Sequence, residues 1–225
     1  MRVVSLVPSV TETLTAWGVD PVACTRFCER DDLVTVGGTK DPDVGAIAAL
    51  GPDLVVVDVE ENRREDYTAL VDAGLAVYVL HVRSLADVGF ELDGLAERVG
   101  VNWTAPRLPP SVPVVRRAFV PIWRRPWMAL GLPTYGGSLL RHLGVEPVFA
   151  RDGPYTTTTL DEAAARHPDV VLAPSEPYPF TARQLPELEA VGPTVFVDGK
   201  DLFWWGARTA DAIVRLAAVL DGSSG

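Results

Sequence analysis

The sequence predicts an α/β protein made of two lobes, each with a parallel β-sheet covered by helices. Short β-branched runs alternate with helical patterns, which is the βαβ rhythm of a parallel sheet. Ordered recurrence of segments indicates that one design occurs twice, so we expect two Rossmann-like lobes whose sheet edges face a central cleft. The recurring segments are Gly18–Val22 with Gly144–Val148, Gly51–Val56 with His167–Leu172, and Gly74–Val79 with Gly192–Val197.

Residues 1–100 form the predicted N-terminal lobe. Ser9 and Glu12 have the spacing of a capping box and are expected to open the first helix. Asp41 and Pro42 supply an N-cap and a first-turn proline for the second helix. Further helices are expected at residues 61–73 and 84–100. The predicted strands are residues 2–7, 21–25, 53–58 and 76–81.

Residues 116–225 form the predicted C-terminal lobe, in which Thr159 and Glu162 again have capping-box spacing. Between the lobes, residues 101–115 are rich in proline and cannot form a continuous helix, so we expect a short extended connector. The predicted strands are residues 117–122, 169–173 and 194–198. The predicted helices are residues 134–143, 159–166, 182–190 and 208–220.

The charge of the chain excludes one class of function. Its 20 basic and 30 acidic side chains give a formal charge of −10, whereas a protein that binds nucleic acid needs a basic face. Residues 1–110 carry most of the excess, with 18 acidic and 9 basic side chains. The first lobe is therefore the anionic one.

Cellular location follows from what the sequence lacks. No apolar run reaches the roughly 18 residues that a membrane span needs, and no secretory signal is recognisable at the N-terminus. We therefore expect a cytoplasmic protein without a membrane span, or a periplasmic or extracellular one if a signal has been removed. Cys24 and Cys28 are expected to be ordinary thiols, because their spacing alone is a weak metal motif.

Candidate binding residues follow the predicted strands, because ligands of open parallel sheets bind at the carboxyl ends of the strands. Four of the six tryptophans fall in these loops, and aromatic faces suit flat or apolar ligands. Several arginines there could clamp carboxylates or phosphates on a ligand. The candidates are Ser9, Arg26, Phe27, Lys40, Glu60, His81, Trp123, Arg124, Trp127, Tyr178, Trp204, Trp205 and Arg208.

Each candidate also has a purely structural interpretation. The tryptophans could pack the lobe interface or the loop bases, the arginines could pair with nearby acids, and Ser9 could serve only as a helix cap. The stretch Gly37–Lys40 lacks the spacing of a phosphate-binding loop and favours a tight turn. Glu60 is most simply part of a solvated helix start. A single histidine, His81, does not define a metal site, and we predict neither a metal site nor a catalytic group.

Five ordered motifs give the chain a family resemblance. It resembles the substrate-binding proteins of cobalamin and ferric-siderophore ABC importers, the helical-backbone metal receptors, and is most similar to their cobalamin-binding-like branch. The resemblance covers nearly the whole chain. The motifs are Val3–Glu12, Val36–Asp43, Leu50–Val55, Pro121–Met128 and Pro174–Phe180.

The resemblance implies a fold and a set of contacts. Members of this family hold their ligand between two lobes, with aromatic residues of the facing loops around it, and dock on a permease through an acidic residue of each lobe. Carried over, the aromatic positions are those of Phe27, Trp123, Trp204 and Trp205, with Arg208 in a matching loop. Glu61 and Glu176 are the docking candidates. The family's long bridging helix is replaced here by the short connector.

The leading functional expectation is a binding protein that has no catalytic activity and takes a bulky metal chelate, namely a corrinoid, haem or siderophore. Its partners would be this small molecule and an ABC permease. The alternative is a cytoplasmic biosynthetic enzyme that reuses the cleft, with His81, Glu60 or Cys28 as acid, base or nucleophile. A regulatory or scaffold role for the acidic first lobe is a third possibility.

Overall fold

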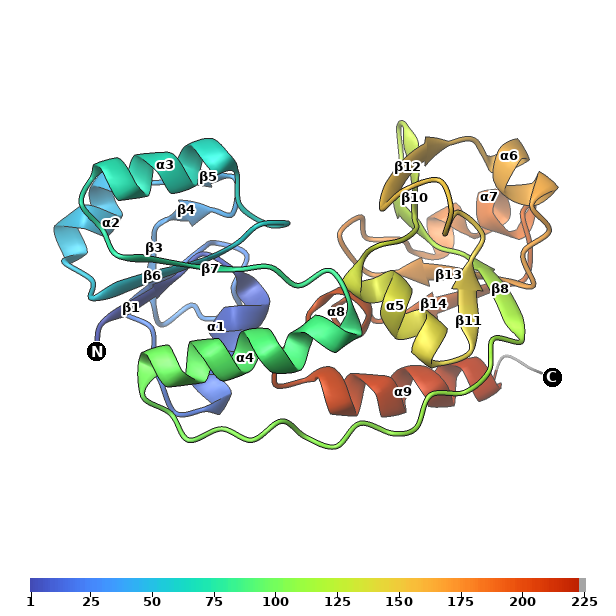
Figure 1. The fold of residues 1–225 in the computed structure, drawn as a ribbon. Coiled ribbons are helices and arrows are strands. Elements are labelled where there is room, and N and C mark those ends of the chain that lie inside the picture. The colour runs from blue at the N-terminus through green and yellow to red at the C-terminus, as the bar shows by residue number, and fades with distance from the viewer. Residues whose placement is uncertain (223–225) are drawn as a thin grey trace. The chain divides into compact units, whose positions relative to one another are not determined.

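The computed structural model describes residues 1–222, and these residues form two compact units (Figure 1). Each unit includes a short segment that is distant in sequence from the rest of it. The N-terminal unit contains Met1–Val82, Ala86–Pro106 and Trp205–Ala207. The C-terminal unit contains Arg83–Leu85, Arg107–Trp204 and the described residues from Arg208 onward.

The N-terminal unit is a parallel sheet in the order β3-β2-β1-β6-β7. Its strands are β1 (Val3–Ser5), β2 (Ala23–Cys24), β3 (Val34–Thr35), β6 (Leu54–Asp58) and β7 (Val77–Leu80). Helices α2 (Val44–Leu50) and α3 (Arg64–Asp72) cover one face, and α1 (Pro8–Ala16) and α4 (Leu85–Val99) cover the other (Figure 1). Apolar residues of β1 and β6 form a fully buried core with Ile47 of α2 and Leu70 of α3.

Two predicted helix starts in this unit are wrong. Helix α1 begins at Pro8 and has no side-chain cap, because Pro8 at the first helical position already fixes the backbone and Ser9 follows it inside the first turn. Asp41 and Pro42 lie in a strand, and the Asp43 carboxylate caps α2 by accepting a 2.9 Å hydrogen bond from the Ala46 amide.

That strand belongs to a small hairpin, β4 (Gly37–Gly38) and β5 (Asp41–Pro42), joined by a two-residue turn. The turn expected within Gly37–Lys40 is confirmed. Gly37 has a φ of 89°, and a Cβ atom there would collide with the backbone of Asp41, so the hairpin depends on glycine at this position.

The C-terminal unit has a parallel sheet in the order β11-β8-β13-β14 and an antiparallel sheet in the order β12-β10-β9. The parallel strands are β8 (Arg116–Phe119), β11 (Val145–Pro147), β13 (Val170–Pro174) and β14 (Thr194–Val197). The antiparallel strands are β9 (Pro121–Trp123), β10 (Trp127–Leu130) and β12 (Tyr155–Thr158). The helices are α5 (Tyr135–His142), α6 (Leu160–Ala165), the 3₁₀ turn η1 (Ala182–Gln184), α7 (Leu185–Glu189), α8 (Gly199–Phe203) and α9 (Thr209–Gly222).

The structure confirms the predicted parallel sheets in both units and differs from the prediction in local detail. The expected strand 117–122 is two strands, because the chain leaves the parallel sheet after Phe119 and joins the antiparallel one at Pro121. The Thr159–Glu162 capping box is confirmed. His167 lies beyond the end of α6, where its φ is 51°.

The connector between α4 and β8 has no helix or strand, as predicted for residues 101–115. Its first part packs on the N-terminal unit, where the ring centroids of Trp103 and Trp17 are 5.6 Å apart. Its second part runs along the C-terminal unit, where the Val112 amide donates to the His142 carbonyl at 3.1 Å and the Val115 amide donates to the Gly144 carbonyl at 2.9 Å.

Candidate functional site

The carboxyl edge of the N-terminal sheet contains one buried acid, Asp58, at the end of β6. Its Oδ1 accepts hydrogen bonds from the amides of Glu60 at 2.8 Å and Glu61 at 3.3 Å, and its Oδ2 accepts from the Val82 amide at 3.4 Å. Burial raises the pKa of Asp58 to about 7, since desolvation disfavours the carboxylate. Asp58 therefore organises the loop that carries the two candidate glutamates.

Asn62 connects this loop to two others. Its Oδ1 accepts from the Asp58 amide at 2.8 Å, and its Nδ2 donates to the carbonyls of Thr39 at 2.8 Å and Leu6 at 3.2 Å. These three bonds join the end of β6 to the end of β1 and to the turn of the hairpin. Neither Asp58 nor Asn62 is among the candidates from the sequence, although an acid that ends a run of buried valines was a usable signal.

The end of β2 and the loop that follows it carry two buried thiols, Cys24 and Cys28. Cys28 Sγ lies 3.2 Å from Thr11 Oγ1 and 3.4 Å from Thr25 Oγ1. A hydrogen bond from Cys24 lowers the pKa of Cys28 to about 6, and the same interaction raises the pKa of Cys24. Both cysteines are free thiols, as the sequence led us to expect.

The other N-terminal candidates lie at the surface or in the first turn of α1. Ser9 is buried, and its carbonyl accepts a 2.8 Å hydrogen bond from the Thr13 hydroxyl. Arg26 forms a 2.8 Å ion pair with Asp41 and lies over the exposed Phe27 ring at 4.9 Å. The remaining candidates, Lys40, Glu60, Glu61 and His81, are all exposed.

Four aromatic side chains of the C-terminal unit form one continuous cluster, which we name the aromatic shelf: Trp123, Trp127, Tyr178 and Phe180. Trp123 meets Tyr178 edge-on with ring centroids 5.8 Å apart, and Tyr178 lies 4.7 Å from Phe180. Trp127 stacks on Phe180 at 5.9 Å with an interplanar angle of 7°. Phe180 is buried beneath the others, whereas Trp123 is 45% exposed.

Three residues of the shelf, Trp123, Trp127 and Tyr178, are separate candidates from the sequence. The fourth, Phe180, is not among those candidates. The β9–β10 hairpin supplies the two tryptophans, and the loop after β13 supplies Tyr178 and Phe180. The contact between these two segments could not be predicted from the sequence, because the antiparallel sheet that positions the hairpin was not predicted.

Arg124 lies beside the shelf and already has a counter-ion. Its guanidinium makes two hydrogen bonds to Glu187, 2.6 Å from Nη2 and 3.2 Å from Nε, and lies 5.8 Å from the centre of the Trp127 ring. The carboxylate of Glu187 raises the pKa of Arg124. The pair holds the hairpin against α7.

Trp204 lies between charged groups of the C-terminal unit. The Lys200 ammonium is 5.2 Å and the Arg208 guanidinium 5.3 Å from the centre of its ring. Arg208 also forms a 3.0 Å ion pair with the buried Asp201, which Arg215 binds with two further hydrogen bonds. Arg208 is thus held by an acid within its own unit.

Glu176 is half-buried in the same region. Its backbone and side chain lie so close to Gly199 that a Cβ atom there would collide with them. Burial raises the pKa of Glu176, and a hydrogen bond with Trp204 opposes this effect. Glu176 therefore supports the Trp204 region.

Trp205 has a different environment from its neighbour Trp204. It is 4% exposed and belongs to the N-terminal unit together with Gly206 and Ala207. The Ala207 amide donates to Thr13 Oγ1 at 3.1 Å, which fastens this segment to α1. The structure therefore places Trp205 in the N-terminal unit, beside the segment that is hydrogen-bonded to α1, and not in the aromatic shelf.

Two further findings concern residues 1–222. Among them, no group of three or more histidine, cysteine, aspartate or glutamate side chains could hold a metal ion. None of their helices combines the length and the apolar character that crossing a membrane would require.

Comparison with known proteins identifies the fold. No protein-family model and no curated protein matches this sequence. Among solved structures, the periplasmic vitamin B12 binding protein BtuF of Vibrio cholerae is similar with a TM-score of 0.75 at 16% identity, over 99% of this chain and 97% of that one.

Two haem-binding structures are similar to the same degree. The periplasmic haem-binding protein BhuT in complex with two haems has a TM-score of 0.78 at 21% identity, over 99% of this chain and 98% of its own. A periplasmic haem-binding protein from Pseudomonas aeruginosa has a TM-score of 0.79 at 19% identity, over 100% of this chain and 94% of its own. The chain thus has the two-lobed fold of periplasmic binding proteins, as its sequence motifs implied.

Proposed function

We propose that this chain is a binding protein, without catalytic activity, for a bulky metal chelate of the corrinoid, haem or siderophore type. The observation that carries the proposal is the aromatic shelf at the end of the C-terminal sheet. A large, partly exposed and rigid aromatic surface is costly in water unless something flat and apolar covers it. The solved proteins of similar fold include ones described as binding vitamin B12 or haem, which supports the same class of ligand.

The ion pairs of the candidate arginines favour one kind of chelate within this class of ligands. Each of the arginines nominated to meet ligand carboxylates is already paired: Arg26 with Asp41, Arg124 with Glu187 and Arg208 with Asp201. A ligand with free carboxylates would have to compete with Glu187 or Asp201 for the partly buried guanidinium of Arg124 or Arg208. We therefore favour a chelate with an uncharged, amide-bearing periphery, such as a corrinoid, over the dicarboxylate haem.

Fluorescence titration tests this proposal. Cyanocobalamin, haemin and ferrichrome are added separately to the purified protein, with N-acetyltryptophanamide as the reference for absorption of light by each chelate. Cyanocobalamin is expected to quench tryptophan fluorescence saturably and to bind more tightly than haemin. Absence of saturable quenching with all three chelates would contradict the proposed function, and tighter binding of haemin would contradict only the preference.

A matched pair of variants assigns the binding to the shelf. Trp123→Ala removes the exposed edge of the aromatic shelf. The variant is expected to bind cyanocobalamin about tenfold more weakly or worse, because a stacked indole contributes on the order of 1.4 kcal/mol or more to the binding free energy. Trp103→Ala changes a tryptophan that packs on Trp17 in the connector and should leave the affinity unchanged. Equal losses of cyanocobalamin affinity in both variants would contradict binding at the aromatic shelf.

Delivery to an ABC permease is the partner role that we propose for this binding protein. The exposed Glu61 is the better docking candidate, since Glu176 is half-buried against Gly199. This role requires the periplasmic or extracellular location, and the similar solved structures are periplasmic proteins, so the cytoplasmic location first expected has no support among them. Binding to the detergent-solubilised permease of the same organism should fall with Glu61→Ala and persist with Asp31→Ala, which changes another exposed acid.

A further inference from the structure

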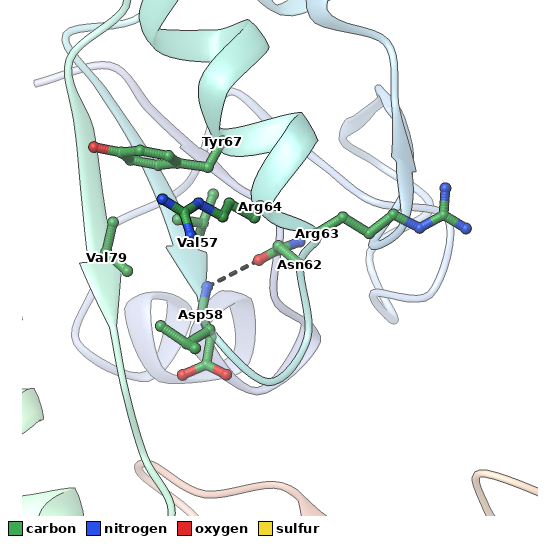
Figure 2. Close-up of a pocket in the computed structure, with 8 residues that line it drawn as sticks. Val57, Asp58, Asn62, Arg63, Arg64, Tyr67 and Val79 are labelled. Carbon is green, nitrogen blue, oxygen red and sulfur yellow. Dashed lines mark hydrogen bonds between the residues drawn. The ribbon is translucent and has the colours of Figure 1, made fainter.

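The N-terminal unit contains an apolar pocket that the proposed function does not use. It has a volume of about 310 Å³ and lies between the first turns of α3 and the edge strand β7 (Figure 2). This volume is at the lower end of the range for small-molecule sites. Its lining residues are Val57, Asp58, Val59, Asn62, Arg63, Arg64, Tyr67 and Val79.

The walls of the pocket are apolar and open to solvent. Tyr67 is 40% exposed, Val79 41% and Val59 50%, so these three side chains give the pocket an accessible apolar lining. Figure 2 shows the Tyr67 ring extending from α3 towards Val79 on β7, with Val57 behind them. In the sheet order β3-β2-β1-β6-β7, strand β7 has only β6 as a neighbour, so the pocket lies at an edge of the sheet.

One positive charge lies among these walls. Figure 2 shows the Arg64 guanidinium below the Tyr67 ring, whereas the Arg63 side chain points away from the pocket. Within residues 1–222, the Arg64 guanidinium has no hydrogen-bond acceptor and no ion-pair partner, in contrast to Arg26, Arg124 and Arg208.

The polar groups at the floor of the pocket are already satisfied. The Asp58 carboxyl group points away from Arg64 and accepts hydrogen bonds from backbone amides. The Asn62 amide bonds to Asp58, Thr39 and Leu6. Arg64 is therefore the group in this pocket that remains available to a ligand.

We infer that this pocket is a second small-molecule site that binds a monocarboxylate with a flat apolar body. The body lies between Tyr67 and the valines of β6 and β7, and the carboxylate pairs with Arg64. A single guanidinium within a strongly acidic unit favours one negative charge over two, which excludes phosphate monoesters. The volume suits about ten to fifteen non-hydrogen atoms, for which we expect a Kd of about 0.1–1 mM.

Titration of the full-length protein with 2-naphthoate tests the inference, with calorimetry for affinity and backbone amide NMR shifts for location. The neutral 2-naphthalenemethanol and the cationic 2-naphthylmethylammonium serve as matched probes. The acid is expected to bind about tenfold more tightly than the alcohol, and to shift amides of α3 and β7. Binding of the alcohol or the amine as tight as that of the acid would overturn the inference. Shifts confined to other segments would also overturn it.

Variants distinguish the contribution of the Arg64 charge to binding from that of the apolar wall of the pocket. Arg64→Gln should lower 2-naphthoate affinity about tenfold and leave that of 2-naphthalenemethanol unchanged, whereas Tyr67→Ala should weaken both. Arg63→Gln is the control, because it removes a neighbouring charge that points away from the pocket. Equal losses from Arg64→Gln and Arg63→Gln would refute the site. Cyanocobalamin binding is measured in parallel, so that failure of this site and failure of the proposed function remain distinguishable.

Discussion

Asp58 is the residue whose chemistry the fold changes most clearly. Burial raises its pKa to about 7 from the ordinary value of 3.8, so the folded protein keeps this proton at pH values where the unfolded chain has lost it. Its contribution to stability is therefore complete below about pH 4 and is lost as the pH rises through about 7. Since each tenfold change in a protonation equilibrium corresponds to about 1.4 kcal/mol, the loss is on the order of 4 kcal/mol at most.

Urea unfolding between pH 4 and pH 8 measures this effect. Asp58→Asn retains an oxygen for the amides of Glu60 and Glu61 but cannot titrate. The free energy of unfolding of the variant should decline less across this range than that of the unchanged protein. Asp31→Asn, at an exposed position, should keep the original slope. Parallel pH profiles for the unchanged protein and Asp58→Asn would contradict the burial argument.

Sequence position identified which residues follow strands but not which partners they meet. Arg124 and Glu187 are far apart in the chain and become partners only because the β9–β10 hairpin packs beside α7. Asp58 was not recognised as a candidate because in the sequence it is only the last residue of an apolar strand. Its burial depends on the loop that folds over it. A side chain's position at the edge of a sheet is thus more predictable than its ionisation or pairing.

At the scale of elements, a strong local sequence signal led to a correct prediction, whereas two signals that conflicted within one segment did not. The run Leu54–Asp58 is β-branched and apolar, and it forms the buried strand β6 as expected. Thr159 and Glu162 form a capping box because both side chains face free amides. Ser9 and Glu12 have the same spacing, yet Pro8 is the first helical residue, so that helix starts two residues earlier than a capping box at Ser9 requires.

The antiparallel sheet of the C-terminal unit was not predictable from periodicity. Its strands are three or four residues long, and Pro121 and Pro126 interrupt the apolar pattern around them. Pairing of β10 with β12 joins segments separated by the whole of α5. The aromatic shelf rests on this sheet, so the part of the candidate site that carries the proposed function required tertiary structure to be recognised.

At the scale of the whole molecule, the two units do not correspond to two continuous stretches of sequence. The N-terminal unit includes Trp205–Ala207, which reaches α1 by a bond from the Ala207 amide to Thr13. Gly206 has a φ of 127°, and a Cβ atom there would collide with the Thr13 hydroxyl. A late segment of the chain is therefore part of the early unit's packing.

Gly206→Ala tests whether the N-terminal unit depends on this segment. The substitution combines an unfavourable backbone conformation with a steric clash and is expected to destabilise the unit by roughly 1–3 kcal/mol. Hydrogen exchange should then show faster exchange in α1 and β1, with β13 and β14 of the C-terminal unit less affected. Gly89→Ala, on α4 with open space around it, is the control and should leave exchange equal or slower. If exchange in α1 is unchanged by Gly206→Ala, or if only β13 and β14 exchange faster, the segment does not support the N-terminal unit in solution.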